Sequence, residues 1–391
     1  MSGAPAMSRV RLGEVRAAPA RVVAGLISGT SMDGIDVAVC RIGSGEPRLL
    51  ELLGARTVPW ALGLAARLRA AHGADALELA RLNRLVGEAF AAAADEVARA
   101  TGVGLELVGS HGQTIAHDHG YTTLQLGEAA VLAERLGCPV VADFRQNDIA
   151  AGGCGAPLVP IVDRWLLSRP DAAVLALNIG GITNLTAIPS RGEPQRPLIG
   201  FDCGPGNMIL DELARRRSAG RESCDRDGRL AAAGEVDRAL LAELLRDPAL
   251  HAPPPRSFGQ EQYGPAFCDA LLRCVSPADE RAWCDLFATV SELTAQAVAS
   301  AYREHVAPLL PTVELIASGG GVRNPDLMRR LAAAMGSVPV VASDERGLSA
   351  DYKEAIAFAL LASARVDGVP GNVPEVTGAA RRVLLGKITE C

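Results

Sequence analysis

The chain has 391 residues, of which 49% are hydrophobic and 21% charged, so it can bury a large core, and its length favours two domains. A net charge of −6 provides no broad basic field for nucleic acid or an acidic membrane, which leaves a small molecule as the expected partner. The sequence contains no Gly-x-x-x-x-Gly-Lys-Ser/Thr loop, so bound phosphate would be held by backbone amides, hydroxyl groups, arginine or a metal ion.

The amino-terminal segment and the cysteines bear on where the protein is found. Residues 1–20 contain no apolar segment typical of a secretory signal, and no apolar run in the chain approaches the length of a bilayer span. Nine cysteines occur without a Cys-x-x-Cys pair or a histidine-rich neighbourhood, which indicates reduced thiols in a cytoplasmic protein. We therefore expect a disordered tail over residues 1–20 of a cytoplasmic protein.

The first structured segment is predicted to be a hairpin, because residues 22–27 and 35–40 are apolar β-type runs. The turn at residues 28–34 carries two glycines, three hydroxyl residues and one carboxylate. Such a mixture can wrap a phosphate with N–H and O–H groups while Asp33 or Asp36 orients Mg²⁺ through water. An ordinary hairpin loop is the alternative, since Gly and Ser are also common in plain turns.

Residues 61–99 repeat apolar side chains near a 3.6-residue period and are predicted to be helical core scaffold. A short strand over residues 105–108 then precedes a polar segment. In that segment His111 is either a proton carrier or a structural histidine. Gln113 and Thr114 are suited to hydrogen bonding with a polar ligand such as a sugar.

Charged residues end the next apolar strand, which is predicted within residues 139–145. Arg145 either pairs with Asp143 or Asp148, or binds a ligand carboxylate, and the sequence leaves both alternatives open. The glycine-rich cluster at residues 151–160 is the expected crossing between the two domains.

Residues 173–188 repeat the opening arrangement of strand, glycine turn with hydroxyl and amide side chains, and strand. Apolar strands alternate with helical segments in both halves of the chain, which indicates α/β architecture. Two glycine hairpins that face one cleft would hold a polyphosphate from both sides.

Residues 200–207 are predicted to be a strand end, a tight loop and a helix start, which places Asp202 at a turn. Gly204 and Gly206 would let a ligand approach the backbone, and the helix N-terminus behind Asn207 would present unpaired N–H groups to it. Asp202 is then either a base beside phosphate or a cap for the helix or the turn.

The last third of the chain contains three further features. Residues 253–261 are predicted to be an irregular, proline-containing loop that could act as a lid. A strand at residues 313–317 leads into the glycines at 319–321, which permit a flat group such as a nucleoside to lie against the backbone. Asn324 is expected to cap the following helix, and Glu354 lies in the first turn of another helix, where the helix dipole accounts for it.

Together these motifs resemble the anhydro-N-acetylmuramic acid kinase family, in family order, from about Val22 to Gly378. The motifs are residues 25–36 (GLISGTSMDGID), 109–114 (GSHGQT), 141–145 (VADFR), 155–160 (GAPLVP), 177–181 (LNIGG), 200–207 (GFDCGPGN) and 318–324 (SGGGVRN). The resemblance implies an actin-like sugar-kinase fold, in which two ribonuclease-H-like domains flank an ATP and sugar cleft. We expect domain I at residues 21–150, joined by 377–391, and domain II at residues 151–376.

The resemblance also implies roles for individual residues, with Asp202 matching the catalytic carboxylate. The residues that match ATP-binding segments are Gly29, Thr30, Ser31, Met32, Asp33, Gly34, Ile35, Asp36, Asn178, Gly180, Gly181, Asn184, Gly319, Gly320, Gly321 and Asn324. The residues that match the sugar side are Gln113, Thr114, Arg145, Gly206, Asn207 and Glu354. The family also implies a homodimer and Mg²⁺, which Asp33 and Asp36 would hold through water.

The implied reaction joins hydrolysis to phosphoryl transfer, because 1,6-anhydro-N-acetylmuramic acid has no free O6. Water attacks C1 with Asp202 as general base, the C1–O6 bond breaks, and O6 takes the γ-phosphoryl group of MgATP. The products are N-acetylmuramic acid 6-phosphate and ADP, in the recycling of peptidoglycan sugars.

Two alternatives stay open. One is a kinase for another anhydrosugar such as levoglucosan, or for an ordinary sugar hydroxyl, and the other is a non-catalytic actin-like ATP-dependent clamp. Arg145 favours a carboxylate-bearing sugar over levoglucosan, and Asp202 favours an enzyme over a clamp. Phe258 and Gln260 depart from the family, which more usually has Thr and a basic residue there, so fine substrate preference is open.

Overall fold

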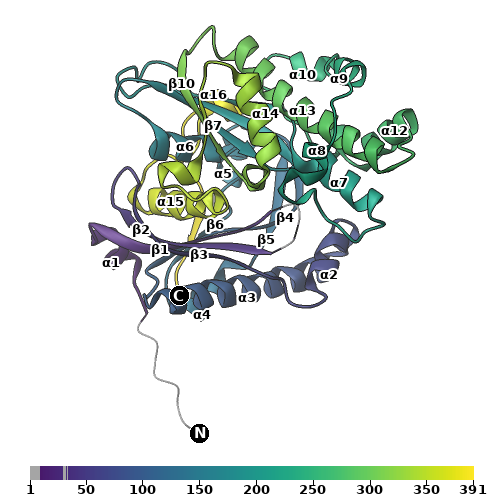
Figure 1. The fold of residues 1–391 in the computed structure, drawn as a ribbon. Coiled ribbons are helices and arrows are strands. Elements are labelled where there is room, and N and C mark those ends of the chain that lie inside the picture. Colours follow the sequence, from purple (N-terminus) through teal and green to yellow (C-terminus); the bar gives the residue numbers. More distant parts are fainter. Residues whose placement is uncertain (1–8, 30–31, 33) are drawn as a thin grey trace. The chain divides into compact units, whose positions relative to one another are not determined.

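The computed structural model describes residues 9–29, 32 and 34–391, which separate into two compact units. Unit 1 comprises the described residues up to Leu166 together with Tyr352–Cys391, and unit 2 comprises Leu167–Asp351. Each unit contains one mixed sheet with helices (Figure 1). The expected α/β class is therefore confirmed for each unit.

Unit 1 is built on a sheet with the strand order β12-β6-β4-β1-β2-β3, to which β5 adds by pairing with β4. Its elements are α1 (Leu12–Ala17), β1 (Ala20–Ser28), β2 (Ile35–Gly43), β3 (Arg48–Val58), α2 (Leu64–Ala70), η1 (Ala71–Gly73), α3 (Ala76–Thr101), β4 (Leu107–Asp118), β5 (Thr122–Leu126), α4 (Ala129–Leu136), β6 (Val140–Ala142), α5 (Gln146–Ala150), α6 (Val159–Leu167), α15 (Lys353–Asp367), α16 (Pro374–Thr377) and β12 (Lys387–Thr389).

Unit 2 is built on a sheet with the strand order β11-β10-β7-β8-β9. Its elements are β7 (Ala173–Ile179), β8 (Ile182–Ile188), β9 (Ile199–Pro205), α7 (Asn207–Arg217), η2 (Arg226–Gly228), α8 (Arg229–Ala233), α9 (Arg238–Leu244), α10 (Pro248–His251), α11 (Gln260–Tyr263), α12 (Pro265–Val275), α13 (Glu280–His305), β10 (Thr312–Ser318), η3 (Gly320–Arg323), α14 (Pro325–Met335), β11 (Val340–Ala342) and η4 (Ser343–Arg346).

The two sheets share one topology. In unit 1, β1, β2 and β3 form an antiparallel meander, and β4 and β6 continue the sheet on the other side of β1 as parallel strands. In unit 2, β7, β8 and β9 form the same meander, and β10 and β11 continue it on the other side of β7, again parallel. This strand order is that of a ribonuclease-H-like domain, so the fold expected for each half of the chain is confirmed.

Helix α3 shows how local sequence produces the unit 1 core. Its apolar side chains recur every three or four residues and form one stripe that is buried in the core. The stripe consists of Leu82, Val86, Phe90, Ala93 and Val97. Asp75 begins the helix by accepting the N–H of Glu78 at 2.8 Å, and Gly102 ends it in the left-handed region at φ 70°.

Helix α15 packs on the opposite face of the same sheet, directly on the backbone. Gly25 of β1 and Gly109 of β4 are register partners, and a Cβ on Gly25 would lie 1.8 Å from the carbonyl oxygen of Ala355. A Cβ on Gly109 would lie 2.1 Å from that of Phe358. The two adjacent glycines thus let α15, which carries Glu354 in its first turn, pack directly on the sheet.

We expect Gly25→Ala to lower the unfolding free energy of unit 1 by about 2 kcal/mol, because the new methyl group must displace α15. Gly13→Ala in α1 is the matched control, since a Cβ there meets nothing within 4 Å. Chemical denaturation followed by circular dichroism would measure both. If the Gly25→Ala protein were as stable as the Gly13→Ala protein, the close packing of α15 on Gly25 would be contradicted.

The boundaries of the two units differ from the predicted ones. The expected crossings at 150/151 and 376/377 lie instead at 166/167 and 351/352, because α15 packs on the unit 1 sheet. The buried carboxylate of Asp148 also ties later segments to unit 1, since it accepts from Gly155 N–H, Asn372 Nδ2 and Thr377 Oγ1, each at 2.8 Å.

The expectation of a disordered tail over residues 1–20 does not hold for its described part. Residues Leu12–Ala17 form α1, Val15 is buried, and the Val10 N–H donates to Gly137 O at 2.9 Å. The residues before Arg9 lie outside the described part. In the part of the chain that is described, no helix is both long enough and apolar enough to cross a membrane.

Candidate functional site

The first predicted phosphate turn joins β1 to β2. Thr30, Ser31 and Asp33 lie outside the described residues, so the structure says nothing of their predicted roles. Met32 has a positive φ of 53°, and its N–H donates to Gly29 O at 3.1 Å, which folds the described part of the turn back on itself. Gly34 and Ile35 are buried at the start of β2, and a Cβ on Gly34 would lie 2.6 Å from Thr57 Cγ2.

Gln113 connects this turn to β4. The predicted strand over residues 105–108 was too short: β4 runs to Asp118, because its second half pairs with β5, so Gln113 and Thr114 lie in a strand. The Gln113 side chain is fully buried, and its Nε2 donates to Gly29 O at 3.3 Å and to Thr114 O at 3.2 Å. Its Oε1 has no partner among the described residues, and Thr114 Oγ1 accepts from Gln125 Nε2 at 3.3 Å.

Two carboxylates lie near this turn. Asp36 on β2 accepts the hydroxyl of Thr57 at 2.6 Å, and Glu354 is half-buried in the first turn of α15. Burial raises the pKa of Glu354, and the charge of Asp36 adds to that increase. The described residues contain no group of three or more side chains that could together hold a metal ion.

Arg145 is held by partners other than those expected. Asp143 pairs with Lys387 and Asp148 accepts from three other donors, and neither forms the predicted ion pair with Arg145 among the described residues. Instead its Nε–H donates to His111 Nε2 at 3.0 Å and its Nη1 donates to Gly155 O at 2.8 Å. Burial lowers the pKa of Arg145 to about 10, which leaves it a cation at neutral pH.

His111 is the structural histidine of the two alternatives. The ring is buried, its Nδ1 lies 3.1 Å from Gly112 O, and its Nε2 accepts from Arg145. Burial, with help from the Arg145 charge, moves the pKa of His111 well below its usual range, so the ring is neutral. Phe358 packs against it with ring centroids 4.6 Å apart. The neutral ring with both nitrogens engaged fixes the direction of the Arg145 guanidinium.

In unit 2 a row of polar side chains crosses three strands. Asn178 on β7 pairs with Asn184 on β8, and Asn184 pairs with Asp202 on β9. Their strand neighbours, such as Leu177, Leu185 and Phe201, belong to the apolar core beneath α13 and α14. Because side chains alternate along a strand, the three polar groups share the opposite face of the sheet, over about 10 Å.

Asp202 lies inside β9 and not at a turn, which corrects the prediction. The reason is the irregular loop at residues 252–259, which covers β9 at the edge of the sheet. The Asp202 N–H donates to Arg256 O at 3.3 Å, Arg256 Nε donates to Asp202 O at 2.8 Å, and the Phe258 N–H donates to Asp202 Oδ2 at 2.8 Å. The segment considered as a lid therefore holds Asp202 in place.

The electrostatics of Asp202 suit a base. Burial raises its pKa to about 6, while the Phe258 N–H and the Arg256 charge oppose that increase. The carboxylate is therefore ionised at neutral pH and yet basic enough to take a proton from water. Its role as a helix cap is excluded, because α7 begins five residues later at Asn207 with Gly206 as its N-cap.

The second glycine turn and the start of α7 are bonded to each other. The N–H groups of Gly206 and Met208 donate to Gly181 O at 2.9 and 3.0 Å, and that of Asn207 donates to Gly180 O at 2.8 Å. The unpaired N–H groups expected at this helix start are therefore already satisfied. The Asn207 side chain also donates to Ile179 O at 3.3 Å, so Gly206 and Asn207 shape the glycine turn.

The third glycine segment meets the same strand end. A Cβ on Gly321 would lie 2.2 Å from Ile179 Cγ2, and one on Gly319 would lie 2.6 Å from Asn178 Oδ1. A Cβ on Gly320 would meet nothing within 4 Å, so this glycine is open on that side. The glycines thus cluster at the carboxyl ends of the parallel strands β7 and β10, where ligands bind in open α/β sheets.

Asn324 differs from the other predicted ATP-binding residues of unit 2. Its Oδ1 accepts the Leu327 N–H at 3.0 Å, which confirms the predicted helix cap of α14. The side chain is nearly buried against Gly228, where an added Cβ would lie 2.0 Å from the same oxygen. Its carboxamide oxygen is thus already engaged.

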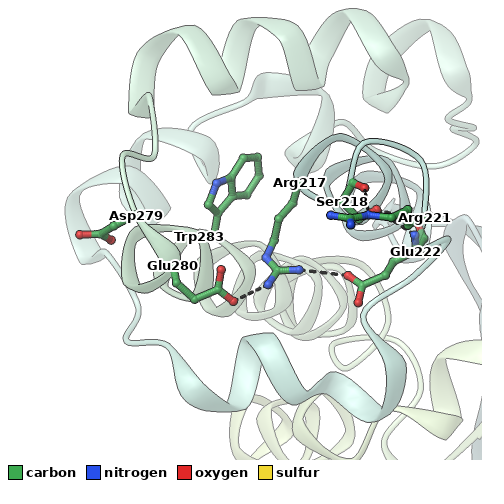
Figure 2. A pocket seen from close by; sticks show the side chains of 7 residues that line it. All are labelled: Arg217, Ser218, Arg221, Glu222, Asp279, Glu280 and Trp283. Atoms are coloured by element: carbon green, nitrogen blue, oxygen red, sulfur yellow. Dashed lines mark hydrogen bonds and ion pairs between the residues drawn. The ribbon is translucent and has the colours of Figure 1, made fainter.

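A pocket in unit 2 lies apart from these residues. It has a volume of about 690 Å³ and is lined by Arg217, Ser218, Arg221, Glu222, Asp279, Glu280 and Trp283 (Figure 2). Figure 2 shows Arg217 between two carboxylates, those of Glu222, at 3.0 Å, and Glu280. Its charge is therefore neutralised, and about 15 Å of α7 separates it from Asn207. The pocket contains no predicted site residue.

Sequence reasoning missed the role of Arg256 and the partner of His111. Arg256 lies in a loop noted for its prolines and for Phe258 and Gln260, and its contact with Asp202 joins residues 54 apart. His111 was noticed, but its partner Arg145 is 34 residues away. A Gly-Ser-His-Gly segment and a Val-Ala-Asp-Phe-Arg segment carry no local sign that the two side chains meet.

Comparison with known proteins bears on the whole chain. The family model for anhydro-N-acetylmuramic acid kinase matches residues 21–391. A protein of that name from Caldanaerobacter subterraneus subsp. tengcongensis is 39% identical over 385 residues, covering 94% of this chain and 97% of that protein. Another of that name from Xanthomonas campestris pv. campestris is 44% identical over 376 residues, covering 93% and 96%. The solved structure of the activator of the 2-hydroxyisocaproyl-CoA dehydratase from Clostridium difficile with bound ADPNP has a TM-score of 0.41 at 11% identity, covering 89% and 96%.

Proposed function

The chain belongs to the anhydro-N-acetylmuramic acid kinase family, and we propose from this premise that it converts 1,6-anhydro-N-acetylmuramic acid, water and ATP into N-acetylmuramic acid 6-phosphate and ADP. The product serves the recycling of peptidoglycan sugars. The catalytic part of the proposal rests on the carboxylate of Asp202. Three hydrogen bonds with Arg256 and Phe258, each involving a backbone group, hold this residue, and burial raises the pKa of its carboxyl to about 6.

Asp202 is the general base of the proposed reaction. It takes a proton from the water whose oxygen bonds to C1 of the sugar, and the electron pair of the C1–O6 bond passes to O6. O6 then bonds to the γ-phosphorus of ATP, and the β–γ bridging oxygen leaves with ADP. Because Phe258 occupies Oδ2 of Asp202, the other carboxylate oxygen is the one that meets the water.

The glycine turns are proposed to bind the phosphates and the nucleoside. In unit 2 these are Gly180, Gly181 and the segment 319–321, with Asn178 and Asn184 in the adjoining row. In unit 1 the turn from Gly29 to Asp36 has the same place in the topology, between the first two strands. Mg²⁺ neutralises phosphate charge when it is bound, and Asp36 would hold it through water, as would Asp33, which lies outside the described residues.

The sugar side is proposed to include Gln113, Thr114, Arg145 and Glu354. The cationic Arg145 supports a substrate with a carboxylate, and the lactyl group of the anhydromuramic sugar supplies one. Among the described residues its Nε donates to His111 and its Nη1 to Gly155, and Nη2 is proposed to face the lactyl carboxylate. Levoglucosan carries no carboxylate that could pair with the Arg145 guanidinium. A homodimer and a cytoplasmic location remain proposals from the family.

The first test of this function is ADP release from purified protein with MgATP and 1,6-anhydro-N-acetylmuramic acid, with levoglucosan and N-acetylmuramic acid in parallel. We expect turnover on the first sugar alone, with ¹⁸O from solvent water at C1 of the product. Turnover on levoglucosan or on the open sugar would overturn the substrate. If none of the three sugars gave ADP release, a non-catalytic clamp would be favoured.

Arg145→Met is expected to raise the KM for 1,6-anhydro-N-acetylmuramic acid by about 30-fold or more, because a charge-assisted hydrogen bond is lost. The KM for 1,6-anhydro-N-acetylglucosamine, which lacks the lactyl group, should change much less. Lys387→Met is the matched control, since it removes a cation from an exposed pair with Asp143. Equal losses on both sugars in steady-state assays would argue against carboxylate recognition by Arg145.

A further inference from the structure

We propose that Arg256 is a positioning residue for Asp202, which orients the base through its main chain and sets the pH range in which it acts. This inference rests on the proposed function of Asp202 as general base. Arg256 donates from Nε to Asp202 O at 2.8 Å, and its own carbonyl accepts the Asp202 N–H at 3.3 Å. The two residues are therefore bonded in both directions across the edge of the sheet.

Arg256 is itself held firmly. Its Nη1 donates to Leu250 O and Ala252 O, both at 2.7 Å, at the end of α10 and the start of the loop. The guanidinium lies 5.1 Å from the ring centroid of Phe201 and 5.9 Å from that of Phe258, so an aromatic residue flanks Asp202 in β9 and another in the loop. Nη2 is buried without a partner in the described structure, so the charge is poorly solvated and is screened little from Asp202.

The arrangement gives Arg256 two separable effects. Its geometry fixes the β9 backbone at the base, and its charge favours the ionised carboxylate, which opposes the burial of Asp202. Lysine in its place would keep the charge but could not make the three bonds of the planar guanidinium. Methionine would remove both the charge and the bonds.

Other titratable groups face this pair and could be mistaken for the base. They are Cys203 on β9, His251 on α10, Tyr263 on α11, and Glu304 and His305 on α13. Of these, the two histidines ordinarily titrate closest to neutrality. Bonds to Leu245 O and Glu304 raise the pKa of His251, and burial lowers that of His305.

The test compares pH profiles of kcat/KM for the anhydromuramic sugar. The wild-type profile should rise with pH and level off above about 6, where Asp202 is ionised. In Arg256→Met the midpoint should move up by about one pH unit, and the plateau should fall about tenfold. In Arg256→Lys the plateau should fall while the midpoint stays. Arg273→Met, at an exposed position of α12, and His251→Gln and His305→Gln should keep the wild-type midpoint.

A second measurement does not depend on turnover. The ¹³C carboxyl resonance of Asp202, assigned by its absence in Asp202→Asn, should titrate at higher pH in Arg256→Met than in the wild type. If both proteins titrate alike, the proposal is overturned whether or not the sugar is the substrate. If the resonance shifts as expected in a protein that does not turn over the sugar, the role of Arg256 stands and the proposed function fails.

Discussion

Asp202→Asn is expected to lower kcat for the anhydromuramic sugar by about 10³-fold or more, because the amide cannot take a proton from water. The change is nearly isosteric, and the amide oxygen can still accept the Phe258 N–H that now bonds to Oδ2 at 2.8 Å. ATP binding, measured by calorimetry with a non-hydrolysable analogue, should therefore stay within about twofold. Retention of more than a tenth of wild-type turnover would exclude Asp202 as the base.

The same variant should be at least as stable as the wild type at pH 8. The folded-state pKa of Asp202, about 6, lies above its ordinary value of 3.8, so the folded protein binds this proton more tightly than the unfolded chain. The charged carboxylate therefore costs stability progressively as pH rises from about 4 to 6, and fully above that. Asparagine removes this cost. Asp227→Asn, at an exposed turn with φ 57°, is the control for the chemical change alone.

Lys353→Met is expected to lower the unfolding free energy of unit 1 by about 3 to 5 kcal/mol, which is larger than any other stability change predicted for this chain. Lys353 Nζ lies 2.9 Å from Asp163 Oδ1, and the two side chains are only 3% and 4% exposed. Removal of the lysine leaves a buried carboxylate without its counter-charge. Urea denaturation monitored by tryptophan fluorescence and circular dichroism would measure the loss.

The double variant Asp163→Leu/Lys353→Met separates the pair from the packing around it. Because neither charge is then left buried alone, it should recover most of the loss. Lys387→Met breaks the exposed pair with Asp143, whose lysine is 67% exposed, and should cost less than about 1 kcal/mol. A Lys353→Met protein as stable as Lys387→Met would show that the buried pair contributes little.

Local sequence patterns were sufficient for the two hairpins and for the helix that forms the unit 1 core. Apolar runs on both sides of glycine turns predicted β1 with β2 and β7 with β8, and the apolar period of residues 61–99 predicted α3. The family resemblance named the ribonuclease-H-like fold, which strand periodicity alone could not have done. The strand orders of the two sheets agree with it.

The errors share one physical cause, which is pairing between residues far apart in the chain. Asp202 lies in a strand because the loop near Arg256 covers the edge of β9. The start of α7 has no free N–H groups at Gly206 and Asn207, since the turn between β7 and β8 accepts them. The second unit boundary lies at 351/352 and not at 376/377 because α15 packs on Gly25, which precedes it by over 300 residues in the sequence. In each case the partner lies too far away in the sequence to be found from the neighbouring residues.

The discontinuity of unit 1 has a consequence for biosynthesis. Unit 2 is one continuous segment, Leu167–Asp351, and all of it has been translated before α15 exists. Unit 1 lacks α15, β12 and the two donors that Asn372 and Thr377 give to Asp148 until the chain is almost complete. Unit 2 should therefore reach its native state on the ribosome before unit 1, whose sheet lacks the helix that covers one of its faces until synthesis is almost finished.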